Sequence, residues 1–165
     1  MKEKSNQQPQ TTELVQAGIK QLKEAGFKLT KKRQEIIELF AESQRYLSAT
    51  HIHQEMSDRY PTMSYNTTYR NIYDFVEIGL LESTEFNQEQ LFRFDCHLLD
   101  TNAVDDHHHH HFICRECGLT LLLDACPMQQ VTTDLTGVII ESHRFEVFGL
   151  CRQCSSKLAK NPVVS

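Results

Sequence analysis

Two cysteine pairs constrain what this chain can fold into more than any other feature of its sequence. Cys114-x-x-Cys117 is matched by Cys151-x-x-Cys154, and 33 residues separate the two pairs. Two intervening residues let both thiolates of a pair reach one ion, and two pairs complete a tetrahedron of soft ligands, which favours Zn²⁺. Because cysteine fills all four positions, no place is left for water, and the pattern indicates a structural zinc site. A redox dithiol is the main alternative, and the second pair argues against it.

A run of five histidines, residues 107–111, leads directly into the first cysteine pair. The run is internal, which argues against an added purification tag. Side chains of a strand alternate between its faces, so His107, His109 and His111 are expected on one face and His108 and His110 on the other. One strand could therefore serve two metal sites. The candidate further ligands are Cys96, Glu82, His97, Asp105, Asp106, His143 and Glu141. A thiolate together with imidazoles selects zinc, or Cu(I), over magnesium or calcium.

The first 95 residues carry the signals of four helices followed by a hairpin. Thr11 or Thr12, Thr30, Ser48 and Ser64 are the expected N-caps. Two strand-like runs, 80–85 and 91–95, flank a turn at 86–90. This order is typical of a winged helix, in which the helix after a short turn enters the major groove of DNA.

The helix expected to begin after Ser64 carries groups suited to phosphates and base edges. The candidate DNA-binding residues are Asn66, Thr67, Tyr69 and Arg70, together with Arg33 in the first turn of an earlier helix. Positive charge in a first turn opposes the helix dipole, so a phosphate contact would explain it. The alternative is that both polar faces serve only solubility.

Charge is distributed unevenly along the chain. The net charge is −5, which by itself argues against a nucleic-acid-binding protein. Residues 1–84, however, carry 11 basic and 11 acidic side chains, and the remaining residues carry 6 and 11. Any DNA binding must therefore depend on local geometry in the neutral half.

These patterns predict an α+β protein of two domains. A polar tail (1–10) precedes a winged-helix domain (11–95), a linker (96–106) and a β-rich domain (107–165) with an antiparallel sheet. In the last domain strands are expected at 107–113, 119–124 and 138–151, and a helix at 128–135. Cys126 is interpreted as a packed thiol, and His51 and His53 as solvated. The sequence begins without an apolar leader and has no long apolar stretch, so we expect a soluble cytoplasmic protein with no membrane partner.

From about Val15 to Cys154 the chain resembles the ferric uptake regulator family of bacterial metal sensors. The motifs that carry the resemblance are Leu29-Thr30-x-x-Arg33, Thr67-Thr68-Tyr69-Arg70, the histidine run into Cys114-x-x-Cys117-Gly118, and His143 followed by Gly149-x-Cys151-x-x-Cys154. Within the family the chain is most similar to the zinc uptake regulators. The residues that favour this branch are Glu82, Arg93-Phe94-x-Cys96, the unbroken histidine run and Ala125-Cys126-Pro127-Met128.

The resemblance implies a homodimer formed through the C-terminal domain, which binds palindromic operator DNA and represses zinc-uptake genes with Zn²⁺ as co-repressor. It also implies a sensing site of Glu82, Cys96, His109 and His111. A third site would use His108, His110 and His143 with a carboxylate, but Gln129 occupies the carboxylate position. Glu141 or an aspartate of the linker could replace it.

Other functions fit the sequence less well. An iron-sensing or peroxide-sensing repressor of the same family is the nearest alternative, and the thiol of Cys96, where the iron-sensing relatives have a carboxylate, favours zinc. A zinc enzyme would need an open coordination position and a general base, and the chain has neither H-E-x-x-H nor the deaminase pattern. A zinc carrier would have no need of the helical half.

Overall fold

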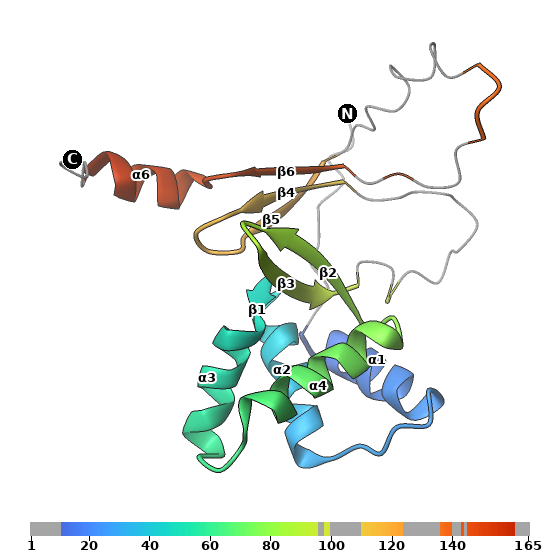
Figure 1. The fold of residues 1–165 in the computed structure, drawn as a ribbon. Coiled ribbons are helices and arrows are strands. Elements are labelled where there is room, and N and C mark those ends of the chain that lie inside the picture. Colours follow the sequence, from blue (N-terminus) through green and yellow to red (C-terminus); the bar gives the residue numbers. More distant parts are fainter. Residues whose placement is uncertain are drawn as a thin grey trace. The chain divides into compact units, whose positions relative to one another are not determined.

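The computed structural model describes residues 11–95, 98–99, 110–123, 136–139, 143 and 145–160. The chain divides into two compact units, residues 1–101 and 102–165, and each is a separate body here (Figure 1). Within the described ranges, no helix combines the length and the apolar character that a membrane span requires.

The first unit contains four helices, the number that the sequence patterns predict. They are α1 (Thr11–Glu24), α2 (Lys31–Ser43), α3 (Ala49–Arg59) and α4 (Tyr65–Glu77). The hydroxyl groups of Thr30, Ser48 and Ser64 each accept a hydrogen bond from the backbone N–H three residues later, at the start of α2, α3 and α4. These side chains satisfy donors that the first helical turn leaves without partners, and three of the four predicted N-caps are confirmed. The prediction of Thr11 or Thr12 as the cap of the first helix was wrong, because α1 already includes both residues.

A small antiparallel sheet completes the first unit. Its strands are β1 (Leu47–Ser48), β2 (Leu81–Phe86) and β3 (Glu89–Phe94), in the order β1-β3-β2. The β2–β3 turn consists of Asn87 and Gln88 alone, with φ of 52° and 65°, so the predicted turn at 86–90 was too long. Two consecutive left-handed residues make a tight turn whose twist matches the flanking strands, and pairing therefore continues to Phe86 and Glu89.

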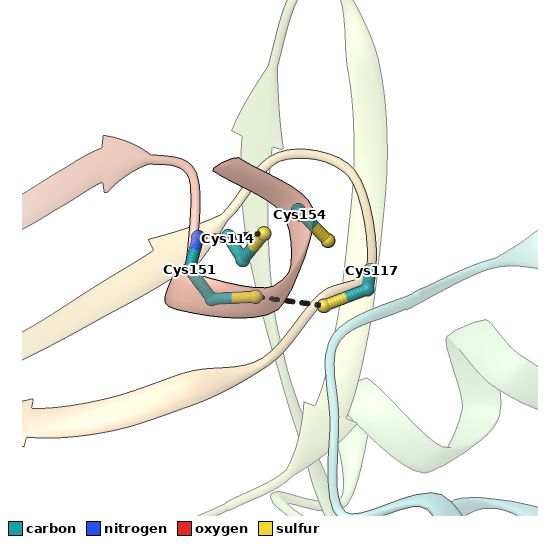
Figure 2. Close-up of side chains that lie close together, drawn as sticks. All are labelled: Cys114, Cys117, Cys151 and Cys154. Carbon is teal, nitrogen blue, oxygen red and sulfur yellow. Dashed lines mark hydrogen bonds between the residues drawn. The ribbon is translucent and has the colours of Figure 1, made fainter. Parts of the chain in front are cut away.

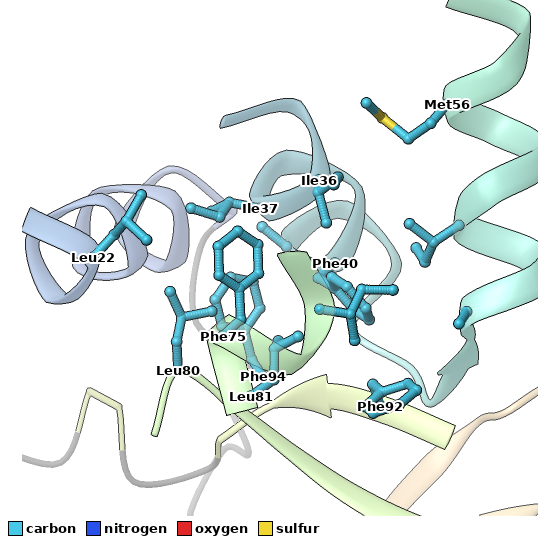
Figure 3. Packing of buried hydrophobic residues seen from close by; sticks show 14 of the residues in the cluster. Leu22, Ile36, Ile37, Phe40, Met56, Phe75, Leu80, Leu81, Phe92 and Phe94 are labelled. Atoms are coloured by element: carbon cyan, nitrogen blue, oxygen red, sulfur yellow. The ribbon is translucent and has the colours of Figure 1, made fainter. Parts of the chain in front are cut away.

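The helices and the hairpin of the first unit share one apolar core (Figure 3). Leu22, Ile37, Phe75 and Phe92 are fully buried in it. Burying a side chain of this size contributes about 1.5–3 kcal/mol, so this core holds α4 and the hairpin in place. The core includes Leu14, Ile36, Phe40, Ile52, Met56, Ile72, Leu80, Leu81 and Phe94.

The second unit has a three-stranded sheet followed by a helix. Its elements are β4 (His110–Cys114), β5 (Thr120–Leu123), β6 (Glu146–Gly149) and α6 (Arg152–Lys160). In the order β5-β4-β6, β5 pairs with β4 antiparallel as predicted, whereas β6 pairs with β4 parallel.

The second unit differs from the sequence-based predictions in two places. The strand expected over 138–151 is much shorter, because Val138 and Ile139 lie outside any strand and pairing with β4 is limited to β6. The sequence patterns also missed α6, which begins directly after Cys151. The helix expected at 128–135 lies outside the described residues.

Candidate metal and DNA-binding sites

The four paired cysteines come together in the second unit (Figure 2). Cys114 ends β4, Cys117 lies in the turn after it, Cys151 precedes α6, and Cys154 lies in the first turn of that helix. All four sulfur atoms lie within 4.8 Å of one another, and the Sγ atoms of Cys117 and Cys151 are 3.8 Å apart. Zn–S bonds of about 2.3 Å in a tetrahedron place sulfur atoms about 3.8 Å apart, so the geometry fits a Zn²⁺ ion.

Backbone hydrogen bonds build the first cysteine turn. The N–H of Gly118 donates to the carbonyl of Cys114 (2.8 Å), and the N–H of Cys114 donates to the carbonyl of Leu119 (2.8 Å). Gly118 has φ of +68°, a left-handed conformation that costs glycine little. The N–H of Cys151 donates to the sulfur of Cys114 (3.3 Å) and so joins the second pair to the first.

Electrostatics in the cluster favour a bound cation. Burial raises the pKa of the Cys114 thiol, but backbone N–H groups of Cys151, Cys117 and Glu116 outweigh burial and lower the pKa to about 6. A hydrogen bond with Cys151, followed by burial and the other cysteines, raises the pKa of Cys154 to about 12. Four thiolates therefore cannot coexist here unless a positive charge offsets their repulsion, and a soft divalent cation supplies it.

Two histidines of the predicted third site lie together in the second unit. His110 is buried in β4, and its ring centroid is 5.2 Å from that of His143. The rings of His110 and Phe145 also lie edge to face, with centroids 5.7 Å apart. His108 and Gln129 lie outside the described residues, so the structure brings together two of the three expected ligands.

The predicted sensing residues are described only in part. His111 is buried in β4 of the second unit, and Glu82 lies in β2 of the first. The carboxylate of Glu82 accepts from Arg93 (2.9 Å), which is its direct cross-strand partner, and from the hydroxyl of Tyr46 (3.1 Å). Cys96 and His109 lie outside the described residues, and this set of ligands stays a prediction.

The side of α4 opposite the core carries most of the predicted DNA-binding residues. Thr68, Ile72 and Phe75 are fully buried, whereas Asn66, Thr67 and Arg70 are exposed. A shallow surface hollow runs along this exposed side. It is lined by Phe27, Arg33, Asn66, Thr67, Arg70, Asn71 and Asp74.

Tyr69 faces a different neighbour, the β2–β3 hairpin. Its ring stacks on that of Tyr65 with centroids 5.8 Å apart, and its hydroxyl donates to that of Tyr73 (2.9 Å). Tyr73 in turn donates to the side chain of Gln90 on β3. The hydrogen bond with Tyr73 raises the pKa of Tyr69 above its ordinary value, with smaller effects of burial and charge. Tyr69 therefore belongs to a row of three tyrosines on α4, Tyr65, Tyr69 and Tyr73, which connects this helix to the hairpin.

Two side chains of the first unit have contacts that the sequence patterns missed. His53 was expected to be solvated, and this was wrong: its Nδ1 lies 2.9 Å from the hydroxyl of buried Thr68, and its Nε2 lies 3.2 Å from that of Ser57. The contact with Ser57 could have been predicted, because Ser57 lies four residues after His53 on the same helix. The contact with Thr68 could not, because only the fold brings the two residues together. Arg33 is likewise bound within the protein, by Lys28, Asn71 and Asp74.

Comparison with known proteins shows which family has this arrangement of residues. The model of the ferric uptake regulator family matches residues 24–148. A ferric uptake regulation protein of Staphylococcus epidermidis is 44% identical over 139 residues, which cover 84% of this chain and 94% of that protein. One from Staphylococcus aureus is 44% identical over 136 residues, with 82% and 94% coverage.

Solved structures share the fold. A zinc uptake regulator in complex with zinc and DNA has a TM-score of 0.65 at 24% identity, covering 92% of this chain and 99% of the other. The Helicobacter pylori ferric uptake regulator has a TM-score of 0.61 at 17% identity, covering 89% and 95%. Together with the family match and the curated relatives, the cysteine cluster and the winged helix identify the chain as a member of the ferric uptake regulator family of metal-responsive transcriptional regulators.

Proposed function

We propose that this chain is a zinc-responsive repressor of zinc-uptake genes, which binds palindromic operator DNA as a homodimer with Zn²⁺ as co-repressor. The observation that carries the proposal is the exposed polar side of α4 in a chain that also holds a cluster of four cysteines. Asn66, Thr67 and Arg70 present amide, hydroxyl and guanidinium groups, which suit base edges and phosphates. Tyr69 completes the proposed set. As a DNA-binding regulator it acts in the cytoplasm.

The four cysteines hold a structural Zn²⁺, and a second ion acts as the signal. Its proposed ligands are Glu82, Cys96, His109 and His111. The first two belong to the residues before 102 and the other two to the residues after it, so one ion bound by all four restricts the relative orientation of the two units. Zinc then raises DNA affinity, and by linkage DNA raises zinc affinity by the same factor, typically about 1–3 kcal/mol.

A third zinc site uses His108, His110 and His143. The 5.2 Å separation of the His110 and His143 rings supports it, because both imidazoles can reach one ion at that spacing. Since Gln129 supplies no carboxylate, Glu141 or an aspartate of the linker completes the ligands.

Exposed apolar side chains on the second unit support the homodimer. Leu121 and Leu122 on β5, Val147 on β6, and Ile139 are all exposed, and Ile139 has 88% of its surface accessible. Apolar groups gathered on one small unit favour burial against another surface. A second copy of this chain presents the same groups, as a twofold interface requires.

An iron-sensing repressor is the second candidate, because the curated relatives at 44% identity are named ferric uptake regulation proteins. One experiment tests the proposal and separates the two candidates. DNA binding is titrated with Zn²⁺, and without oxygen with Fe²⁺ or Mn²⁺, while bound metal is counted per chain. Because most protein sites bind Zn²⁺ more tightly than Fe²⁺ or Mn²⁺, the extent of activation decides, not the midpoint. We expect Zn²⁺ to give full DNA binding and saturating Fe²⁺ or Mn²⁺ to give little, and full DNA binding with Fe²⁺ would favour iron. Zinc binding without any DNA binding would indicate a zinc carrier instead.

A further inference from the structure

The guanidinium of Arg33 reaches from the first turn of α2 across to α4. Its Nε donates to Oδ1 of Asn71 (3.0 Å), and its Nη2 lies 2.8 Å from Oδ2 of Asp74. Its Nη1 donates to the backbone carbonyl of Lys28 (3.0 Å), and the guanidinium also lies over the Phe27 ring, 5.0 Å from its centroid. Each guanidinium nitrogen thus has a partner within the protein.

The environment of this ion pair makes its contacts strong. The side chains of Arg33 and Asp74 are only 17% and 21% exposed, so solvent screens their attraction less than that of a surface pair. Asn71 and Asp74 are three residues apart on α4 and therefore lie on one side of the helix. A planar fork that binds both at once opposes rotation of α4 about its own axis, which a point charge could not do.

The bound side of α4 adjoins its exposed polar side. Nδ2 of Asn71 donates to the backbone carbonyl of Thr67 (2.9 Å), so one amide joins Arg33 to the first turn of the helix. Thr67 and Arg70 line the same hollow as Arg33. Any rotation that Arg33 prevents would therefore move the groups proposed to contact DNA.

A direct phosphate contact by Arg33 would disturb this arrangement. A phosphate bound by the remaining N–H groups of Arg33 would lie beside the carboxylate of Asp74 and be repelled by it. A phosphate that displaced Asp74 would leave that carboxylate uncompensated beside the DNA backbone. Arg70 needs no such exchange, because it is exposed on the same hollow.

We infer that Arg33 is a positioning residue for DNA recognition, which fixes the rotation of α4 through Asn71 and Asp74 and does not itself bind DNA. This inference rests on the proposed DNA-binding function. On this inference Asp74 favours DNA binding although it is acidic and lies on the DNA-binding helix, because it holds Arg33 in place.

The test compares variants of the full-length zinc-loaded protein on one DNA probe. The probe is a 30-base-pair duplex, of about three helical turns, selected from a random library by the wild-type protein. Asp74→Asn breaks the ion pair, and Arg33→Lys keeps the charge but loses the fork. Glu77→Gln is the matched control, because it removes the same charge from an exposed position on α4. Affinity is measured by fluorescence anisotropy, and folding of each variant is checked by circular dichroism.

A positioning role predicts that Asp74→Asn and Arg33→Lys each weaken DNA binding about tenfold or more, and that Glu77→Gln leaves it unchanged or slightly stronger. A phosphate contact predicts the reverse for Asp74→Asn, since removing an anion near DNA and freeing Arg33 would strengthen binding. It also predicts that Arg33→Lys retains most of the affinity.

Retained affinity in Arg33→Lys overturns the inference, and this variant decides the matter if Asp74→Asn fails to fold. A wild-type protein that selects no duplex would overturn the proposed function and this inference with it. If only the inference fails, the wild type binds the duplex tightly, and Asp74→Asn and Arg33→Lys bind it with the same affinity.

Discussion

Two arginines of the first unit differ in what surrounds them, and the roles proposed for them follow from that difference. Arg70 is exposed on α4, whereas Arg33 is bound by Asn71 and Asp74. The sequence patterns treated both as DNA contacts, because each is a cation at a helical position that could face a phosphate. Asp74 lies 41 residues from Arg33 along the chain, so only the folded structure reveals the ion pair.

Arg70→Ala is expected to weaken DNA binding by about 1–3 kcal/mol per protomer while leaving the zinc content unchanged. The loss follows from removing a charged donor on the exposed side of α4. Anisotropy titrations and metal analysis measure the two quantities. Lys20→Ala on α1 is the control, since it removes an exposed positive charge from another helix. Equal affinities of Arg70→Ala and the wild type would exclude Arg70 as a DNA contact.

The cysteine cluster leads to a prediction about pH. In the metal-free protein the pKa of Cys154 is raised to about 12, and that of Cys117 is also raised, chiefly by burial. Both thiols therefore carry protons near neutral pH, and zinc must displace them. The affinity of this site for zinc should fall about 100-fold or more when the pH drops by about one unit from 8. Competition with a chelator at several pH values measures this, and a constant affinity would contradict it.

At the scale of elements, local signals were sufficient where one side chain determines a boundary. Thr30, Ser48 and Ser64 could be predicted as N-caps because each satisfies backbone donors of its own helix. The parallel pairing of β6 with β4 could not, because register between distant segments depends on the fold. The turn of the hairpin was also misjudged, since glutamine is an unusual residue at a left-handed position.

That turn can be tested by Gln88→Gly. Gln88 has φ of 65°, which costs an L-residue more than glycine, so the substitution should raise the free energy of unfolding of the first unit by about 0.5–1 kcal/mol. Urea denaturation followed by circular dichroism measures the change. Glu89→Gly is the opposite control, because it introduces glycine into β3 and should be destabilising. A loss of stability in Gln88→Gly would show that the left-handed conformation carries no strain.

At the scale of the whole molecule, the sequence supports two kinds of metal site with different roles. The cysteine cluster could be predicted completely, because two short motifs contain all of its ligands, and the structure brings their sulfur atoms within 4.8 Å. The cluster brings the end of β4 and the start of α6 together in the second unit. The response to metal instead rests on the proposed ligands Glu82, Cys96, His109 and His111, of which Cys96 is the one that favours zinc.

The most direct test of this account is zinc-titrated DNA binding by Cys96→Ser, with metal counted per chain and Cys126→Ser as the control. We predict that Cys96→Ser loses about one zinc per chain, keeps the ion at the four cysteines, and no longer binds DNA more tightly when zinc is added. Cys126→Ser should behave like the wild type. Fully zinc-dependent DNA binding by Cys96→Ser would contradict the proposed sensing site.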